Sequence, residues 1–256
     1  MPYIDRAGVR LRYDVRGDGP PILLSHGFAA TSGMFAPNLD ALALGHTVLT
    51  WDLRGHGDSD SPADPAAYSV PLCVEDMAAL LDRVGAASAI VGGHSLGGYL
   101  SLEFHLAYPE RTRALVLIDT GPGYRSGDRR AGWNDFAERY ARRLEQQGLA
   151  AIADGDELRA GAHRDPTGLV LAARGMLVQH DARVLESLRA VSVPVLVIVG
   201  EQDEAFLAGA RYMADKIPTA TFEVVTDARH APNVTHPGRF NELVTTFLEP
   251  IDAVRP

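Results

Sequence analysis

The segment Gly93-His94-Ser95-Leu96-Gly97 places a serine between two glycines, shortly after the apolar residues Ala89-Ile90-Val91. This G-x-S-x-G spacing predicts a sharp turn from a strand into a helix, in which the serine has strained backbone angles and only glycine fits at the flanking positions. Such a turn would present the Ser95 hydroxyl at the carboxyl end of the strand. The pattern therefore predicts that Ser95 is a catalytic nucleophile.

A serine hydroxyl is a poor nucleophile at neutral pH, so catalysis requires a base that accepts its proton and an acid that orients the base. His230 follows the last predicted strand, where the carboxyl ends of parallel strands gather, and is the predicted base. Asp203 follows the strand before it and is the predicted acid. Two alternatives stay open for the acid: Asp119, one strand earlier, and Glu201, two residues before Asp203.

Backbone N–H groups could stabilise the negatively charged oxygen that develops when a serine attacks a carbonyl. Leu96 directly follows the nucleophile at a predicted helix N-terminus, so its N–H is one expected donor. The run Ser25-His26-Gly27-Phe28 follows an earlier strand, and its glycine permits close approach of the backbone. We expect the Phe28 N–H to be the second donor, and His26 to brace this loop rather than carry a proton.

The elements predicted around these residues form an α/β fold. Short apolar runs recur with helical segments between them, which is typical of buried strands in a mostly parallel sheet. Alternating residues at 9–15 predict an antiparallel edge strand with one solvated face. The buried strands are predicted at 21–24, 46–51, 88–91, 114–118, 193–199 and 221–225, with helices at 74–84 and 96–108 among the segments between them. Because strand and helix alternate, right-handed crossovers should place helices on both faces.

The alternation breaks in the second half of the chain. Residues 133–149 and 169–188 have helical patterns, and no convincing strand separates them. We therefore expect a helical insertion at 121–190 over the edge of the sheet, with 1–120 and 191–256 forming one core. Such insertions commonly cover a site and move, although an elaboration without functional contact stays an alternative.

Four motifs together resemble the α/β-hydrolase superfamily, in particular its serine esterase-like branch with a helical cap. They are His26-Gly27-Phe28, the run from Asp52 to Ser59 (DLRGHGDS), Gly93-His94-Ser95-Leu96-Gly97, and the pair Asp203 and His230, in the family's order. The resemblance implies a mostly parallel eight-stranded sheet with helices on both faces and a helical cap after Gly121. It also implies that Arg54 and His56 have structural roles.

In this family the cap typically supplies the roof of the substrate pocket. The candidate substrate contacts are Trp133, Phe136, Tyr140 and Met176 in the cap, with Phe206 and Leu207 just after Asp203. The core of a helix would use the same residue types, so each contact stays open. A serine nucleophile in place of an aspartate argues against the haloalkane dehalogenase and epoxide hydrolase branches.

These features predict a carboxylesterase-like hydrolase that cleaves an ester of a small, largely apolar molecule through an acyl-enzyme on Ser95. A lactonase, or a carbon–carbon bond hydrolase acting on a dienoate, would use the same residues. A perhydrolase and a small-molecule receptor on the same fold are further alternatives. The sequence contains neither metal-ligand spacing nor a phosphate-binding glycine loop, so we expect no metal and no organic cofactor.

The 256-residue chain has a formal net charge of −9, which disfavours nucleic acid and anionic membranes as partners. Its densest basic cluster, Arg125, Arg129 and Arg130, is interrupted by Asp128 and is interpreted as a solvated face. The lone Cys73 excludes an intrachain disulfide and is predicted to be half-buried. No signal peptide or long apolar stretch is evident. We expect a cytoplasmic monomer or homodimer that acts on a small-molecule ester or lactone.

Overall fold

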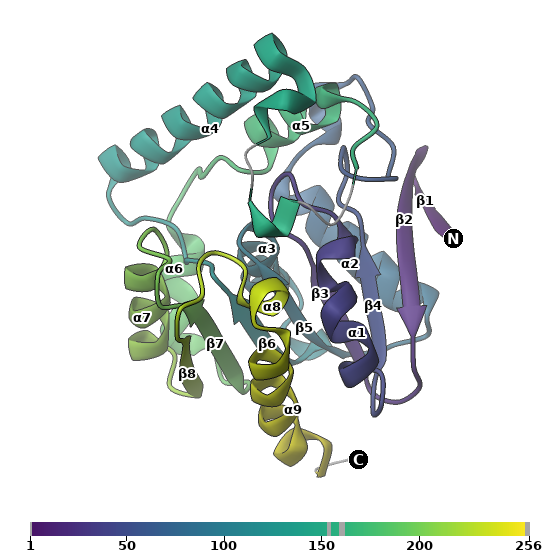
Figure 1. Cartoon of the computed structure of the whole chain (residues 1–256), viewed down its shortest axis with the longest axis vertical. Helices are drawn as coiled ribbons and strands as arrows, with labels where there is room; N and C mark the ends of the chain where they lie inside the picture. The colour runs from purple at the N-terminus through teal and green to yellow at the C-terminus, as the bar shows by residue number, and fades with distance from the viewer. Residues whose placement is uncertain (1, 153–154, 159–161, 254–256) are drawn as a thin grey trace.

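Figure 1 shows a computed structural model of the protein, which describes residues 2–152, 155–158 and 162–253. Eight strands form one sheet in the order β1-β2-β4-β3-β5-β6-β7-β8. They are β1 (Tyr3–Arg6), β2 (Val9–Arg16), β3 (Pro21–Ser25), β4 (Thr47–Trp51), β5 (Ala89–His94), β6 (Thr112–Ile118), β7 (Val195–Gly200) and β8 (Ala220–Val225). The β1–β2 and β2–β4 pairs are antiparallel and the other neighbours are parallel. The predicted mostly parallel, eight-stranded sheet is confirmed.

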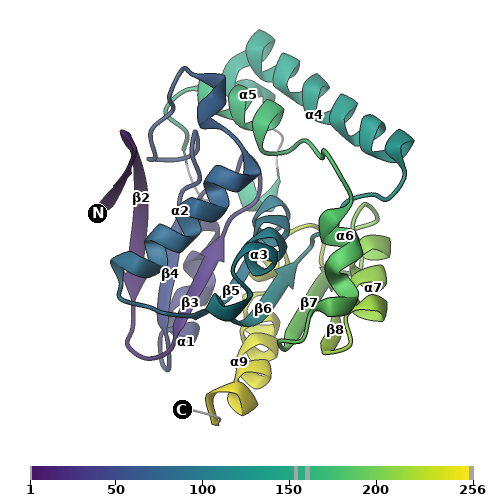
Figure 2. The same ribbon diagram turned by 180° about the vertical axis from the view of Figure 1, so that it is seen from behind.

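Helices cover both faces of the sheet. They are α1 (Ala36–Leu42), α2 (Val70–Arg83), α3 (Leu96–Ala107), α4 (Gly127–Gln147), α5 (Pro166–Gly175), α6 (Arg183–Ser187), α7 (Leu207–Lys216), α8 (Pro232–Thr235) and α9 (Pro237–Ala253). One face carries α2, α3 and α7, and the other carries α1 and α9, as the two opposite views show (Figures 1 and 2). In the described ranges, every helix is too short or too polar to cross a bilayer.

The central strands are continuous runs of apolar residues because helices pack against both faces of the sheet. In β7, Val195 and Val197 join the core beneath α2, α3 and α7. Leu196 and Ile198, which alternate with them, join the core beneath α1 and α9. Side chains that alternate along a strand point to opposite faces, so a sheet covered on both sides needs apolar residues at every position.

Two elements differ from the sequence-based expectation. Strand β1 has no predicted counterpart, because its residues are only exposed or half-buried and form no apolar run. The helix predicted at 169–188 is two helices, α5 and α6. Between them, the Leu177 carbonyl accepts a hydrogen bond from the Trp133 indole at 2.7 Å, and Gln179 exchanges two backbone hydrogen bonds with the Asn134 side chain. These contacts to α4 satisfy backbone groups that a continuous helix would otherwise pair.

Helices α4 and α5 lie against each other beyond one end of the sheet (Figure 1). Ala141 and Leu144 of α4 and Leu169 and Ala173 of α5 form a small separate core. Helix α6, which follows in the chain, packs against α3 of the main core. The assignment of 121–190 as a cap domain stays a prediction; its helices α4 and α5 are the cap.

Cys73 is fully buried rather than half-buried as predicted. It lies on the face of α2 that points into the main core, together with Met77 and Leu80. Burial raises the pKa of its thiol, so the uncharged form is stabilised.

Candidate active site

Ser95 lies in the turn between β5 and α3, with a φ of +51° and a ψ of −114°. Positive φ is unfavourable for a residue with a side chain, so this position is strained. A Cβ on Gly97 would lie 1.9 Å from the Ser25 carbonyl oxygen, and one on Gly93 would lie 2.4 Å from the Gly97 carbonyl carbon. The Thr120 hydroxyl donates a hydrogen bond to the Ser95 carbonyl at 2.7 Å. The glycines thus allow a close approach to β3, and Thr120 holds the turn in place.

His230 and Asp203 meet above the ends of β7 and β8. The distance from His230 Nδ1 to Asp203 Oδ2 is 2.7 Å. Burial alone would raise the pKa of Asp203, but the hydrogen bond and charge of His230 lower it below the ordinary value. The Phe206 ring stacks on the imidazole at 4.8 Å, and the His94 ring lies edge-on at 4.5 Å. His230 is therefore held between two rings, and it lines the same cavity as Ser95.

Asp119, one of the alternative acids, is fully buried at the end of β6. Its Oδ1 accepts a hydrogen bond from the Gly200 N–H at 2.9 Å, and its Oδ2 is buried without a hydrogen-bond partner in the described chain. Side-chain atoms of Asp119, Asp203 and His230 lie within 4.8 Å of one another. Burial and the neighbouring Asp203 carboxylate raise the pKa of Asp119 well above its ordinary value. These three groups could reach one metal ion, although the His230–Asp203 hydrogen bond already engages two of them.

Glu201, the other alternative acid, points to a different partner. Its Oε2 accepts a hydrogen bond from the Asp227 N–H at 3.1 Å, and its side chain is exposed. The structure thus brings Asp203 to His230 and Asp119 beneath both, while Glu201 fixes the loop that leads to His230.

The two residues predicted to form an oxyanion hole both border the cavities at Ser95. Phe28, in the loop after β3, lines the larger cavity together with Ser95 and His230. Leu96 is the first residue of α3 and lines the adjoining cavity. The N–H groups in the first turn of a helix have no acceptor within that helix, so the Leu96 N–H is available to a ligand.

Buried side chains support the loops around these residues. His26 accepts a hydrogen bond from the Leu53 N–H at 2.9 Å through Nε2, and its Nδ1 donates to a neighbouring carbonyl. Burial lowers the pKa of His26 to about 4, which keeps the ring neutral. Arg54 pairs with buried Asp76, and the His56 ring bonds to the Arg54 carbonyl. These contacts match the structural roles predicted for His26, Arg54 and His56.

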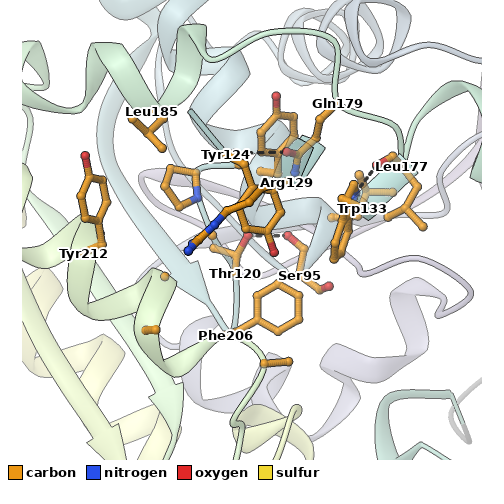
Figure 3. Close-up of a pocket in the computed structure, with 18 of the residues that line it drawn as sticks. Ser95, Thr120, Tyr124, Arg129, Trp133, Leu177, Gln179, Leu185, Phe206 and Tyr212 are labelled. Atoms are coloured by element: carbon orange, nitrogen blue, oxygen red, sulfur yellow. Dashed lines mark hydrogen bonds between the residues drawn. The ribbon is translucent and has the colours of Figure 1, made fainter. Parts of the chain in front are cut away.

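Two cavities, of about 780 and 980 Å³, meet at Ser95. Neighbouring aromatic rings form an arc around them, with centroids 4.8–6.4 Å apart, in the order Phe28, Tyr140, Phe136, Trp133, Phe206 and His230. Figure 3 shows Trp133 from the cap and Phe206 from the core near Ser95. The arc connects the loop of Phe28 with His230 by way of the cap, so the space at Ser95 is enclosed largely by apolar surface.

Most of the predicted substrate contacts line the cavities at Ser95, and one packs against the main core instead. Five line one or both cavities: Trp133, Phe136, Tyr140, Met176 and Phe206. Leu207, the first residue of α7, is half-buried, packs against the main core and lines neither cavity. Their role as substrate contacts stays a prediction.

Arg129 was missed as a wall residue. The cluster that contains it was interpreted as a solvated face, and Arg129 is exposed, but it also lines both cavities, and Figure 3 shows its side chain among the residues around Ser95. It lies four residues before Trp133 and therefore on the same face of α4, which is a signal that the sequence offered.

Comparison with known proteins identifies the family of the fold. The family model described as alpha/beta hydrolase fold matches residues 20–165. The 2-hydroxymuconate semialdehyde hydrolase of a Pseudomonas species is 30% identical over 264 residues, which cover 96% of this chain and 93% of that protein. A thermophilic esterase from Thermogutta terrifontis superposes with a TM-score of 0.83 at 25% identity, over 98% of this chain and 100% of that one. An enol-lactonase from Burkholderia xenovorans has a TM-score of 0.79 at 26% identity, over 96% and 99% of the two chains. The chain therefore belongs to the α/β-hydrolase family.

Proposed function

We propose that the protein is a serine hydrolase that cleaves carboxylic esters. The observation that carries this proposal is the strained turn at Ser95, which opens into the same cavity as a His230 that is hydrogen-bonded to Asp203 at 2.7 Å. In this mechanism, His230 takes the Ser95 proton while the hydroxyl oxygen attacks the carbonyl carbon. The N–H groups of Phe28 and Leu96 stabilise the oxyanion.

The second half of the reaction uses the same groups. His230 gives its proton to the departing alcohol, which leaves the acyl group bound to the Ser95 oxygen. Water then attacks the acyl-enzyme with His230 again as the base, and Ser95 regains its proton as the carboxylic acid departs. Two cavities that meet at Ser95 suit this chemistry, since one could hold the acyl group and the other the alcohol.

The named relatives favour acyl transfer, and they leave one further candidate. The Thermogutta protein is an esterase and the Burkholderia protein an enol-lactonase, both of which act on acyl–oxygen bonds. The 2-hydroxymuconate semialdehyde hydrolase supports carbon–carbon bond hydrolysis as a second candidate, because it matches nearly the whole chain. Parallel assays with an ester, a lactone and a vinylogous diketone would rank the three reactions.

Covalent labelling tests the nucleophile directly. We expect a fluorophosphonate probe to label the wild-type protein and to leave Ser95→Ala unlabelled, because the probe reacts only with an activated serine. His230→Ala should label far more slowly. Ser126→Ala is the matched control, since Ser126 also lines one of the cavities, and it should label like the wild type. Labelling of Ser95→Ala at the wild-type rate, or no labelling of the wild type, would exclude the proposed function.

The substrate we propose is small and mostly apolar but carries an anionic group. Arg129 lines both cavities and has no hydrogen bond or ion pair within the described residues, and Arg139 lines the larger cavity. A guanidinium group is suited to binding a carboxylate through paired hydrogen bonds. The Thermogutta esterase, which shares the fold, was solved with malate, a dicarboxylic acid, bound.

Matched substrates would test this preference. A p-nitrophenyl monoester of glutaric acid and the neutral p-nitrophenyl pentanoate have similar length and differ in charge. We expect Arg129→Gln to lower kcat/KM for the anionic ester about fivefold, as for the loss of an exposed charge pair, and to leave the neutral ester unchanged. Arg142→Gln is the control, because Arg142 pairs with Glu138 on α4. Equal effects on both esters would contradict the preference.

A further inference from the structure

We propose that Asp119 is a neutral carboxylic acid that donates a hydrogen bond to the Asp203 carboxylate and thereby positions the acid that orients His230. This role rests on the proposed function, because it assigns Asp119 a task in the same reaction. Asp119 would not contact the substrate, so it is a positioning residue rather than a catalytic one.

The backbone of Asp119 is tied to β7, the strand that precedes Asp203. The Asp119 N–H donates to the Ile198 carbonyl at 2.9 Å, and Asp119 Oδ1 accepts from the Gly200 N–H at the same distance. Asp119 has a φ of +43°, which is unusual for a residue with a side chain. Two hydrogen bonds to the end of β7 and a strained backbone thus hold the carboxyl group beneath Asp203.

The surroundings decide which of the two carboxyl groups carries a proton. Two carboxylates within 4.8 Å of each other in a buried site cannot both ionise without a large penalty. Asp203 receives a hydrogen bond from His230 at 2.7 Å, which favours its charged form. Asp119 is fully buried, and the carboxylates of Asp203 and Glu157 raise its pKa further. The proton therefore belongs on Asp119.

A proton on Asp119 also explains why one of its buried oxygens has no acceptor role in the structure. Asp119 Oδ2 lacks a hydrogen-bond partner among the described residues, although buried polar atoms in folded proteins are almost always paired. A proton on Oδ2 turns this oxygen into a donor, and the Asp203 carboxylate is the nearby acceptor. One negative charge then remains beside the imidazole, where two would hold its proton too tightly for a base that must release it in every cycle.

Two substitutions at position 119 distinguish the loss of the hydrogen bond to Asp203 from the loss of the carboxyl group itself. Asp119→Asn keeps an acceptor for the Gly200 N–H and an N–H donor for Asp203, so kcat should stay within about threefold of wild type. Asp119→Ala removes both, and kcat should fall about tenfold to hundredfold, as expected for the loss of a hydrogen bond to a charged group, with KM little changed. If Asp119→Asn folds and loses as much activity as Asp119→Ala, the proposal is wrong.

The pH dependence provides a readout that a merely structural role would not move. The acid limb of the kcat/KM profile reports protonation of the base in the free enzyme. Because Asp119 is neutral, Asp119→Asn removes no charge near Asp203 and His230, and the midpoint of this limb should not change. If Asp119 were ionised, the substitution would remove a negative charge and move the midpoint to lower pH by about one unit. That shift would overturn the proposal.

Infrared spectroscopy detects the proton without turnover. At neutral pH, the wild-type protein should show the carbonyl stretch of a protonated carboxyl group, and the band should appear in the difference spectrum of wild type minus Asp119→Asn, because the variant lacks this group. Absence of this band in the wild type would refute the proton assignment even in an active enzyme. A band in a protein that the fluorophosphonate probe does not label would refute the proposed function and leave the proton assignment intact.

Discussion

Ser95→Ala is expected to lower kcat for ester hydrolysis by about 10⁶-fold, the loss seen when the nucleophile of a serine triad is removed. The reason is that no other group in the proposed mechanism can form the acyl-enzyme. Binding should persist, since the cavity walls are unchanged, so KM should shift little. Steady-state hydrolysis of a p-nitrophenyl ester by the purified variant would give this value, with the uncatalysed rate subtracted.

The change should leave the fold intact. Alanine has a Cβ as serine does, so the strain at φ +51° and the contacts of the flanking glycines stay the same. The melting temperature of Ser95→Ala should therefore match the wild type. Without a nucleophile, the remaining activity should be far below about one per cent of wild-type kcat. A folded Ser95→Ala variant that keeps more than about one per cent would show that Ser95 is not the nucleophile.

Asp203→Asn is expected to lower kcat by about 10⁴-fold, the loss expected when the acid of the triad can no longer hold the imidazole in the required tautomer. In the wild-type protein, His230 Nδ1 donates to Asp203 Oδ2 at 2.7 Å, which leaves Nε2 to accept the Ser95 proton. An amide can present an N–H to Nδ1 and so favour the opposite tautomer. The kcat of the variant, measured with the same ester, checks this value.

The alternative acids provide matched controls. Glu201→Gln should leave kcat nearly unchanged, because Glu201 is exposed and bonds to the Asp227 N–H. Asp119→Asn should keep most of the activity for the reason given above. A larger loss in either control than in Asp203→Asn would reassign the acid.

The positions of Ser95, Asp203 and His230 could be predicted because each directly follows a strand that the sequence marks clearly. A parallel sheet brings the carboxyl ends of its strands to one rim, so local signals were sufficient to place distant residues together. The same logic located seven of the eight strands. Strand β1 was not predicted, because a short edge strand needs no run of apolar residues.

Other features depend on contacts that no local pattern reveals. The protonation of Asp119 follows from Asp203, which lies 84 residues later in the chain and near it only after folding. The break between α5 and α6 follows from the side chains of Trp133 and Asn134 on another helix. Arg129 is exposed, as its cluster was interpreted, but its place at the cavities was not predicted, because net charge and neighbouring acids describe a surface on average and do not say which residues of α4 border a cavity.

The conformation of Ser95 also bears on how this protein could evolve. A positive φ at a residue with a side chain costs about 1–3 kcal/mol, and glycine would relieve that cost. Gly97 is fixed independently, because any larger residue would collide with the Ser25 carbonyl. A descendant that no longer needed hydrolysis would therefore gain stability from glycine at position 95 and keep glycine at 97. Serine persists at such a position only while selection for turnover outweighs selection for a more stable fold.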